Sequence, residues 1–551
     1  MLSQIKFNNF TTKVNVKVNP TLLENGITTR DFWSKWIIYL LIIFIIFSFT
    51  IVKSPNFWVD EHMNVDLGRI ILQPDTRWAI SWMTKQMQPV YLFSYLGIVF
   101  QEIIYQKTGH FGPGIFALIG AFFAATIMVK WLLAIGTSHK VALFLSLVFL
   151  LDPLFVQSYT LGRLDGWTIA SCLFVCLLLR NTSNNLHLEK FFCEIRIALA
   201  GGMTVVSIFI WPSAFFLYPL ILLEFIYLLS LVKSRTKSWN KVALPILIFG
   251  LGSLIAFFFL IIPIYSKLLT QISDVISTIQ INLRDENIKA DKPFYMRFFE
   301  SAIGFLKIFK YSPVLPLIAF IGIIRIKKVG LFVAGLTAAL IMICTLVYPN
   351  RVLYLIPYFI IGTAYLFHVR HTRSIDYKSF LFSSLQAYVL VFLLIWSITL
   401  SIGARTILSL EKVKDQEIDQ LYRVGESMLG KGNYNVFAPY ELYYIGRSLG
   451  WRMYYPYVAW GENKLSPKEI DRLLPLIDFA IIGEENLTKN LVNQLKENGM
   501  YDLGYYQLYK KPLPRLPFDG ITTNTIRLRN LYKIYKQPFG PYKLFARESK
   551  K

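Results

Sequence analysis

Eleven long apolar runs separated by short polar segments constrain this chain more than any other feature of its sequence. A helix needs about 20 consecutive apolar residues to cross a bilayer. Charged residues make up 17% of the 551 positions and hydrophobic residues 54%, whereas soluble domains carry about 25% charged residues. The sequence therefore predicts a polytopic α-helical membrane protein of about eleven spans. The runs are Trp36–Val52, Ile115–Val129, Val141–Ser158, Leu164–Leu179, Ile197–Ile210, Ser213–Val232, Val242–Tyr265, Tyr311–Ile324, Val329–Val347, Val352–Phe367 and Phe380–Ile402.

Basic residues mark one side of the predicted membrane. Lys- and Arg-rich segments such as KSRTKSWNK and RIKK fall on alternate sides of successive runs, and the N-terminus is basic as well. Cytoplasmic loops carry this excess of Lys and Arg. We therefore expect a multi-pass plasma (inner) membrane protein with residues 1–35 in the cytoplasm and its C-terminal region outside. The net charge of +23 is spread between the apolar runs, so we expect no nucleic-acid partner.

The sequence divides into four regions. Residues 36–402 form the transmembrane domain, which includes a long first outer loop, 53–114. After it, the short β-like segments NVFA, RMYYPY, DFAIIG and YYQLYKK alternate with helical segments such as ELYYIGRSLG. This alternation predicts a small extracytoplasmic α/β domain with a partly parallel sheet over residues 403–511. Residues 512–551 form a basic tail that contains prolines.

An acidic stretch lies just outside the first run, where aromatic anchors alone would be enough to mark the membrane interface. It contains Asp60, Glu61 and His62. A carboxylate here can take the proton of an acceptor hydroxyl as the hydroxyl oxygen attacks an electrophile. Partial desolvation beside the bilayer would raise the carboxyl pKa and strengthen the base. The alternative interpretation is a solvated loop at the interface.

Three further polar clusters are expected on the same side. Arg163 and Asp165 precede the fourth run, where ionisable groups are costly and mark functional sites; alternatively, they pair only with each other. Arg351 follows a very short outer turn and faces an anionic headgroup, unless it merely snorkels at a span end. Lys85, with Arg77 nearby, is either a phosphate ligand or an interfacial anchor. A lipid-borne phosphate would need such cations together with a carboxylate that activates the acceptor.

This layout resembles the glycosyltransferase C superfamily. An Asp-Glu pair follows the first span within ten residues, a Pro-Tyr element (QPVY) ends the outer loop, an Arg-x-Asp precedes a later span, and RVLYLIP opens a late one. Within the superfamily the chain is most similar to protein O-mannosyltransferase-like enzymes and to the lipid A aminoarabinose transferase. The resemblance implies a polyprenyl-phosphate-sugar donor and Asp60 as the catalytic base.

The sequence departs from the aminoarabinose transferase pattern beside the Pro-Tyr element. That branch carries an acid and a lysine immediately before the element, whereas this chain has Met87 and Gln88. Lys85 lies about one helical turn earlier and is the substitute for the missing lysine. The departure argues against an aminoarabinose donor.

The predicted function is transfer of one sugar from a polyprenyl-phosphate carrier to an acceptor hydroxyl on a protein, lipid or glycan. Asp60 would be the base and Glu61 would tune it. The sequence identifies no certain cofactor, and a divalent cation beside Asp60 and Glu61 is one candidate. The rival interpretations are a transporter or flippase and a non-catalytic membrane scaffold that presents the C-terminal domain. The candidate substrate-binding residues are His62, Lys85, Arg163, Asp165, Arg351 and Tyr354.

Overall fold

The chain divides into two compact units, Met1–Ile43 and Phe44–Lys551. The first unit contributes the beginning of helix α1 (Thr29–Lys53), and the remaining helices and strands belong to the second unit. The computed structural model describes residues 29–53, 59–73, 94–186, 190–265, 293–308, 314–326, 328–345, 349–367, 377–403, 406, 417–454, 473–484, 487–506 and 539–547.

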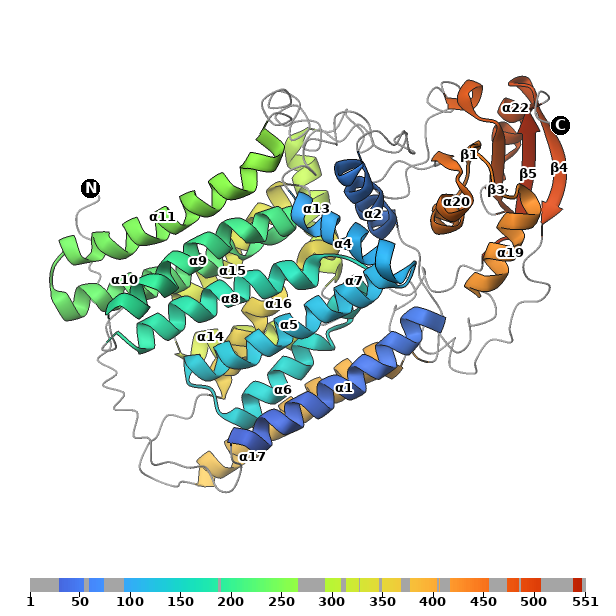
Figure 1. Cartoon of the computed structure of the whole chain (residues 1–551). Helices are drawn as coiled ribbons and strands as arrows, with labels where there is room; N and C mark the ends of the chain where they lie inside the picture. Colours follow the sequence, from blue (N-terminus) through green and yellow to red (C-terminus); the bar gives the residue numbers. More distant parts are fainter. Residues whose placement is uncertain are drawn as a thin grey trace. The chain divides into compact units, whose positions relative to one another are not determined.

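Packed apolar helices make up most of the second unit (Figure 1). They are α4 (Tyr95–Thr108), α5 (Gly112–Ile135), α6 (His139–Leu150), α7 (Pro153–Thr160), α8 (Asp165–Asn184), α9 (Lys190–Ile210), α10 (Tyr218–Thr236), α11 (Asn240–Ile261), α13 (Phe294–Ile308), α14 (Val314–Ile326), α15 (Val329–Cys344), α16 (Ile356–Leu366) and α17 (Tyr377–Ile398). Helix α8 packs between α5 and α9, and α9 also packs against α11. Helix α14 packs against α16.

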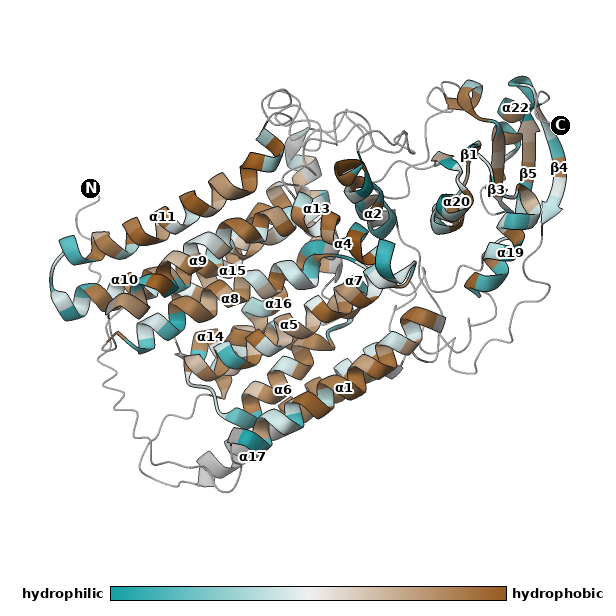
Figure 2. Cartoon of the chain, in the orientation of Figure 1, coloured by the Kyte–Doolittle hydropathy of each residue, from teal (hydrophilic) through white to brown (hydrophobic). Residues whose placement is uncertain are grey.

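Hydrophobic residues predominate along the helices of this bundle (Figure 2). Many of their large side chains are exposed, while others form its interior. On α11, Leu247 is 68% exposed and Phe259 is 72% exposed. Water does not favour so large an apolar surface, whereas lipid chains solvate it. The chain is therefore an integral membrane protein.

Five described helices are long and apolar enough to cross a membrane, and a sixth span arises if α6 and α7 count as one bent helix. Each of the eleven predicted runs is mostly helical over its described part, and the run Val141–Ser158 is broken between α6 and α7. Several of these helices are shorter apolar helices, such as α14 and α15, so the count of eleven crossings stays a prediction. The five long helical segments are Arg30–Val52, Gly112–Ile135, Phe191–Ile210, Pro212–Thr236 and Asn240–Ile264.

A sharp bend of 56° joins α6 to α7. Asp152 caps α7, because its carboxylate accepts a hydrogen bond from the backbone N–H of Leu154 at 3.0 Å. Pro153 occupies the first helical position, where its missing N–H costs nothing. The hydroxyl of Tyr159 donates to the carbonyl of Leu150 across the bend. The bend sets the direction of α7, and the four-residue turn after α7 leads directly into α8.

The acidic stretch forms a helix, α2 (Val59–Leu72), which packs closely on α4. The two helices meet at Gly68, where an added Cβ would collide with the carbonyl oxygen of Ile98 and the Cβ of Glu102. Only glycine permits this approach. Helix α2 continues without a break from the acids through the apolar residues Ile70, Ile71 and Leu72.

A five-stranded sheet lies in the C-terminal region, in the order β2-β1-β3-β5-β4. Strand β1 pairs in parallel with β2 and β3, whereas β5 is antiparallel to both β3 and β4, so the sheet is mixed. The first four strands overlap the four predicted segments. The fifth lies in the segment expected to be a basic tail. The strands are β1 (Asn435–Phe437), β2 (Arg452–Tyr454), β3 (Phe479–Gly483), β4 (Met500–Tyr506) and β5 (Tyr542–Arg547).

Three short helices accompany the sheet: α19 (Ile418–Met428), α20 (Tyr443–Leu449) and α22 (Lys489–Glu497). Helix α20 connects the neighbouring parallel strands β1 and β2, as a crossover helix must. It ends at Gly450, whose φ of 83° provides a left-handed cap. The crossover thereby leaves one face of α20 buried in the sheet region and a second face available to α2 and α4.

Candidate active site

Asp165 is the centre of a buried polar network at the start of α8. Its Oδ2 accepts hydrogen bonds from the Ser158 hydroxyl at 2.6 Å and from Nε of Arg163 at 2.7 Å. Its Oδ1 accepts a hydrogen bond from the Tyr354 hydroxyl at 2.6 Å and lies 3.4 Å from Nη1 of Arg351. One buried carboxylate therefore orients two guanidinium groups and a phenol.

The network brings together four of the residues that the sequence singled out: Arg163, Asp165, Arg351 and Tyr354. The local pair of Arg163 and Asp165 exists, but it does not account for the site, because Arg351 and Tyr354 arrive from a segment 186 and 189 positions away. Ser158 was not predicted as a site residue. It lies in α7, five residues before Arg163, and no sequence pattern distinguishes it from other serines.

Among the described residues, this network holds two guanidinium groups and one carboxylate. The side chains of Arg163 and Arg351 are only 10% and 9% exposed. A buried charge is stable only when it is paired or bound by a ligand of opposite sign. The guanidinium of Arg351 also lies 5.6 Å from the ring of Trp211. Such a site can accept an anion with the geometry of a phosphate.

The turn between α7 and α8 is the point where α2 and α4 meet this network. Gly162 has a φ of +68°, and an added Cβ there would collide with the carboxylate of Glu61. The side-chain amide of Gln101 on α4 donates to the carbonyl oxygen of Gly162. Glu61 of α2 therefore lies against the short turn that also carries Arg163.

Burial changes the protonation of the acidic stretch. Glu61 and His62 are 5% and 0% exposed, so neither is the solvated side chain of the alternative interpretation. Desolvation raises the pKa of Glu61 to about 8, and a hydrogen bond from Tyr444 opposes this rise. Desolvation also lowers the pKa of His62 to about 3. Asp60 lies in the first turn of α2, and its side chain is outside the described part of the structure.

Sequence reasoning missed the C-terminal partners of α2 and α4. The hydroxyl of Tyr444 donates to Oε1 of Glu61 at 2.5 Å, and Arg447 forms a two-pronged ion pair with Glu102 on α4. Gln101 was also missed; its Oε1 is buried and has no hydrogen-bond partner among the described residues. The segment ELYYIGRSLG does contain a recognisable pattern. Arg447 lies four residues after Tyr443 and three residues after Tyr444, so its side chain shares a helical face with both.

Two sequence hypotheses are not settled by this geometry. Lys85 lies outside the described residues, as does its neighbour Arg77. Within the described ranges, no group of three His, Cys, Asp or Glu side chains is placed to hold a metal ion. The described residues therefore add no third ligand to the cation site expected beside Asp60 and Glu61.

Comparison with known proteins identifies the fold. No protein-family model matches the sequence, and no curated protein matches it significantly. The structure is similar to ArnT from Cupriavidus metallidurans bound to undecaprenyl phosphate, with a TM-score of 0.54 and 10% identity over 87% of this chain and 97% of that one. The apo state of the same protein matches with a TM-score of 0.48 and 9% identity, over 86% of this chain and 96% of that chain. The chain therefore shares the overall fold of ArnT.

Proposed function

We propose that the protein transfers a single sugar from a polyprenyl-phosphate carrier to an acceptor hydroxyl on the extracytoplasmic side of the membrane. The fold supports sugar transfer at the membrane, and the similar ArnT structure contains undecaprenyl phosphate. The observation that carries the proposal is the contact of Glu61 of α2 with the Gly162 turn, which continues into Arg163 and the Asp165 network that holds Arg351. This contact supports a single site in which an acid of α2 and the arginines act on one substrate.

The proposed chemistry is a single displacement with inversion. The acceptor oxygen attacks the anomeric carbon, the bond from that carbon to the phosphate oxygen breaks, and Asp60 takes the hydroxyl proton. The leaving polyprenyl phosphate gains a negative charge in this step. Arg163 and Arg351 stabilise that charge, because preorganised cations act strongly in a site that excludes water. Lys85 is a third candidate for the phosphate.

The neighbouring residues orient the reacting groups. Asp165 fixes both guanidinium groups, and Tyr354 and Ser158 hold Asp165 in turn. The buried Oε1 of Gln101 is an acceptor beside the same turn, which suits a hydroxyl group of the sugar. Glu61 lies next to the base and tunes its environment.

The test is Asp60→Asn, which keeps the size of the side chain but removes its basicity. We expect turnover to fall by about 10²–10⁴-fold, as for the loss of a general base, with normal expression and membrane insertion. Mass spectrometry of lipid-linked sugars and glycans in a deletion strain identifies the donor that accumulates, and complementation with D60N measures the loss.

Asp419→Asn is the matched control, because it removes an exposed carboxylate in the first turn of α19. It should complement fully. Full complementation by D60N as well would end the assignment of Asp60. Unchanged lipid-linked sugars in the deletion strain would instead favour the scaffold interpretation.

A further inference from the structure

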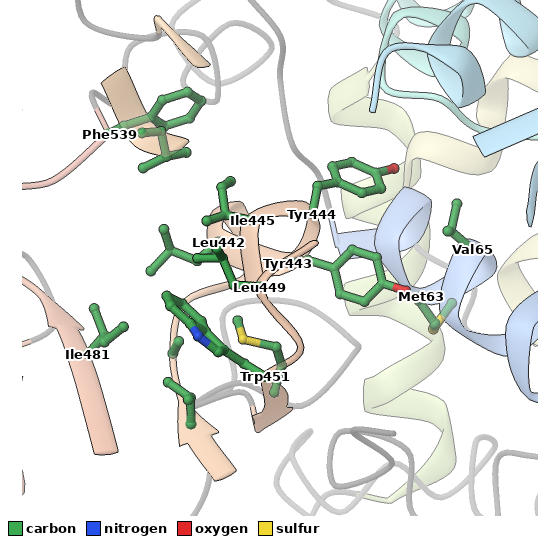
Figure 3. Packing of buried hydrophobic residues seen from close by; sticks show 14 of the residues in the cluster. Met63, Val65, Leu442, Tyr443, Tyr444, Ile445, Leu449, Trp451, Ile481 and Phe539 are labelled. Atoms are coloured by element: carbon green, nitrogen blue, oxygen red, sulfur yellow. The ribbon is translucent and has the colours of Figure 1, made fainter. Parts of the chain in front are cut away.

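Helix α20 packs its tyrosines directly against α2. Tyr443 and Tyr444 are fully buried, and they belong to one hydrophobic cluster with Met63 and Val65 of α2. Figure 3 shows both tyrosines extending from α20 toward α2. The sheet region and the acidic helix therefore share a continuous core, which a loosely attached module would lack.

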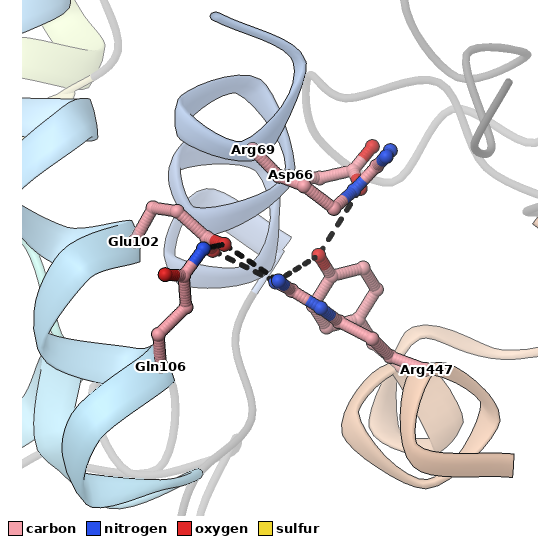
Figure 4. Close-up of polar contacts among 6 residues, drawn as sticks. Asp66, Arg69, Glu102, Gln106 and Arg447 are labelled. Carbon is pink, nitrogen blue, oxygen red and sulfur yellow. Dashed lines mark hydrogen bonds and ion pairs between the residues drawn. The ribbon is translucent and has the colours of Figure 1, made fainter. Parts of the chain in front are cut away.

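An ion pair holds α20 at this position. Nη1 and Nη2 of Arg447 lie 2.7 Å and 2.5 Å from the two carboxylate oxygens of Glu102, and Gln106 donates to the same carboxylate at 2.6 Å. The Arg447 side chain is 14% exposed and the Glu102 side chain 0%. Two-pronged arginine–carboxylate pairs of this kind fix orientation as well as distance. We call Arg447 and Glu102 the clamp (Figure 4).

A second contact links α20 to the middle of α2. The Tyr443 hydroxyl lies 3.4 Å from Nη1 of Arg447 and donates to Asp66 at 3.1 Å. Asp66 also pairs with Arg69 at 2.9 Å. The chain of contacts runs from the clamp through Tyr443 to α2, as the dashed lines in Figure 4 show.

Tyr444 reaches the acidic stretch itself. Its ring stacks on Tyr105 of α4, with centroids 4.8 Å apart and an angle of 19°. The guanidinium of Arg447 lies 4.4 Å from the centroid of the same Tyr105 ring. The Tyr444 hydroxyl donates to Oε1 of Glu61, and the Glu61 carboxylate lies against Gly162. Stacking on one side and the hydrogen bond on the other leave this phenol a single orientation.

We infer that α20 is an integral part of the active site, with Tyr444 as a positioning residue that holds the Glu61 carboxyl at the Gly162 turn while the clamp holds α20 in place. This inference rests on the proposed function and assigns a role in it to the C-terminal region. Tyr444 acts through Glu61 and does not touch the reacting atoms. Without Tyr444, the buried carboxyl of Glu61 would have other rotamers available. Its position relative to Arg163 and to Asp60 would then no longer be fixed.

The first experiment is Tyr444→Phe. It removes the hydroxyl but keeps the ring and its stacking on Tyr105. A hydrogen bond from a phenol favours the charged carboxylate, so its loss raises the pKa of Glu61 further. We expect kcat/KM to fall about tenfold and the limb of the pH–rate profile set by Glu61 to move up by about one pH unit. Among the described residues, the titratable or charged side chains on the elements near Glu61 include Tyr443, Tyr444 and Arg447 of α20, Glu102 and Tyr105 of α4, Arg163 and Asp165 after Gly162, and His62, Asp66 and Arg69 of α2.

Tyr542→Phe is the matched control. Tyr542 is a fully buried tyrosine whose hydroxyl donates to a carboxylate, Glu441, at 3.2 Å within the C-terminal region. Its loss should lower thermal stability without moving the pH–rate profile. Equal shifts of the profile in Y444F and Y542F would overturn the inference, because they would mark a general effect of loosening the sheet region.

A readout that needs no sugar transfer separates this inference from the proposed function. The carboxyl of Glu61 gives an infrared band when protonated, which Glu61→Gln identifies by its disappearance. We expect the titration of this band to move to higher pH in Y444F. A shifted band in a protein that transfers no sugar would leave the positioning role intact and refute the function. An unshifted band in an active enzyme would refute the positioning role.

The second experiment releases the clamp. Removing one partner of a buried ion pair leaves an uncompensated charge, whereas removing both is far less damaging. Arg447→Met combined with Glu102→Gln should therefore fold and insert better than Arg447→Met alone. We expect the double variant to reproduce the pH shift of Y444F although it leaves Tyr444 in place. A double variant with the wild-type profile would show that α20 stays on α2 without the clamp and would overturn that part of the inference.

Discussion

Glu61 and His62 are adjacent buried residues whose pKa values are shifted in opposite directions by burial. In the unfolded chain they titrate near 4.5 and 6.5, whereas burial moves the pKa of Glu61 to about 8 and that of His62 to about 3. Between pH 4.5 and 8 the folded state keeps a proton on Glu61 that the unfolded chain has lost. The free energy of unfolding therefore falls as pH rises through this window.

His62 has the opposite effect between pH 3 and 6.5. There the unfolded chain binds a proton that the folded state excludes, so the free energy of unfolding rises with pH. The two slopes cancel between pH 4.5 and 6.5. Above pH 6.5 only the Glu61 slope remains, at about 1.4 kcal/mol per pH unit. For this pair alone, stability should form a plateau in mild acid and decline on either side of it.

The residue-scale prediction is that Glu61→Gln removes the decline between pH 6.5 and 8. Glutamine has the same size and never ionises, so the folded protein no longer loses a bound proton as pH rises. The measurement is the thermal unfolding midpoint in detergent across this range. Glu497→Gln, at an exposed position on α22, should keep the wild-type decline. A decline of equal slope in E61Q would mean that another group is responsible.

At the scale of elements, the four-residue turn between α7 and α8 determines where Glu61 of α2 lies relative to the network around Asp165. Gly162 allows both the positive φ and the close approach of Glu61. Asp152 and Pro153 form the start of α7, which leads to this turn, and Asp165 is the first residue of α8 after it. The turn thus connects helix geometry to the position of Arg163.

The element-scale prediction is that Gly162→Ala impairs sugar transfer far more than it impairs folding. A left-handed conformation costs a non-glycine residue about 1 kcal/mol or more, and the new Cβ must also push the Glu61 carboxylate aside. Gly499→Ala is the matched control, because Gly499 has a φ of +72° and no atom within 4 Å of an added Cβ. We expect similar losses in unfolding midpoint but a fall in kcat/KM only in G162A. Normal kcat/KM in G162A would show that the position of Glu61 is not critical.

At the scale of the whole molecule, the property to test is the side of the membrane that each region faces. The basic segments predict that the C-terminal region is outside and that the segment between α10 and α11 is inside. Arg235 and Lys489 are exposed positions in these two regions. In a background with the four native cysteines replaced, Lys489→Cys should react with an impermeant maleimide in intact spheroplasts. Arg235→Cys should react only after permeabilisation, and the reverse pattern would invert the topology.

The sequence predicted the parts of the structure that local patterns encode. Long apolar runs must become helices in a bilayer, because every backbone group must find a partner inside its own segment. The Arg-x-Asp and RVLYLIP elements identified Arg163, Asp165 and Arg351 as separate candidates, but they did not show that these side chains meet at one carboxylate. No local pattern could show that Glu61 lies beside Tyr444 or that Glu102 lies beside Arg447. Strand β5 was missed because its partners, β3 and β4, are what make the short segment YKLFAR a strand.

The contact between Glu61 and Tyr444 joins residues that are 383 positions apart. This separation has a consequence for the synthesis of the protein on the ribosome. At about 5–20 residues per second, a ribosome needs roughly 20–80 s to proceed from one residue to the other. During that interval α2 has been synthesised, but the phenol that contacts Glu61 has not. We therefore expect Glu61 of the growing chain to lack its hydrogen-bond partner until α20 has been synthesised and has packed on α2.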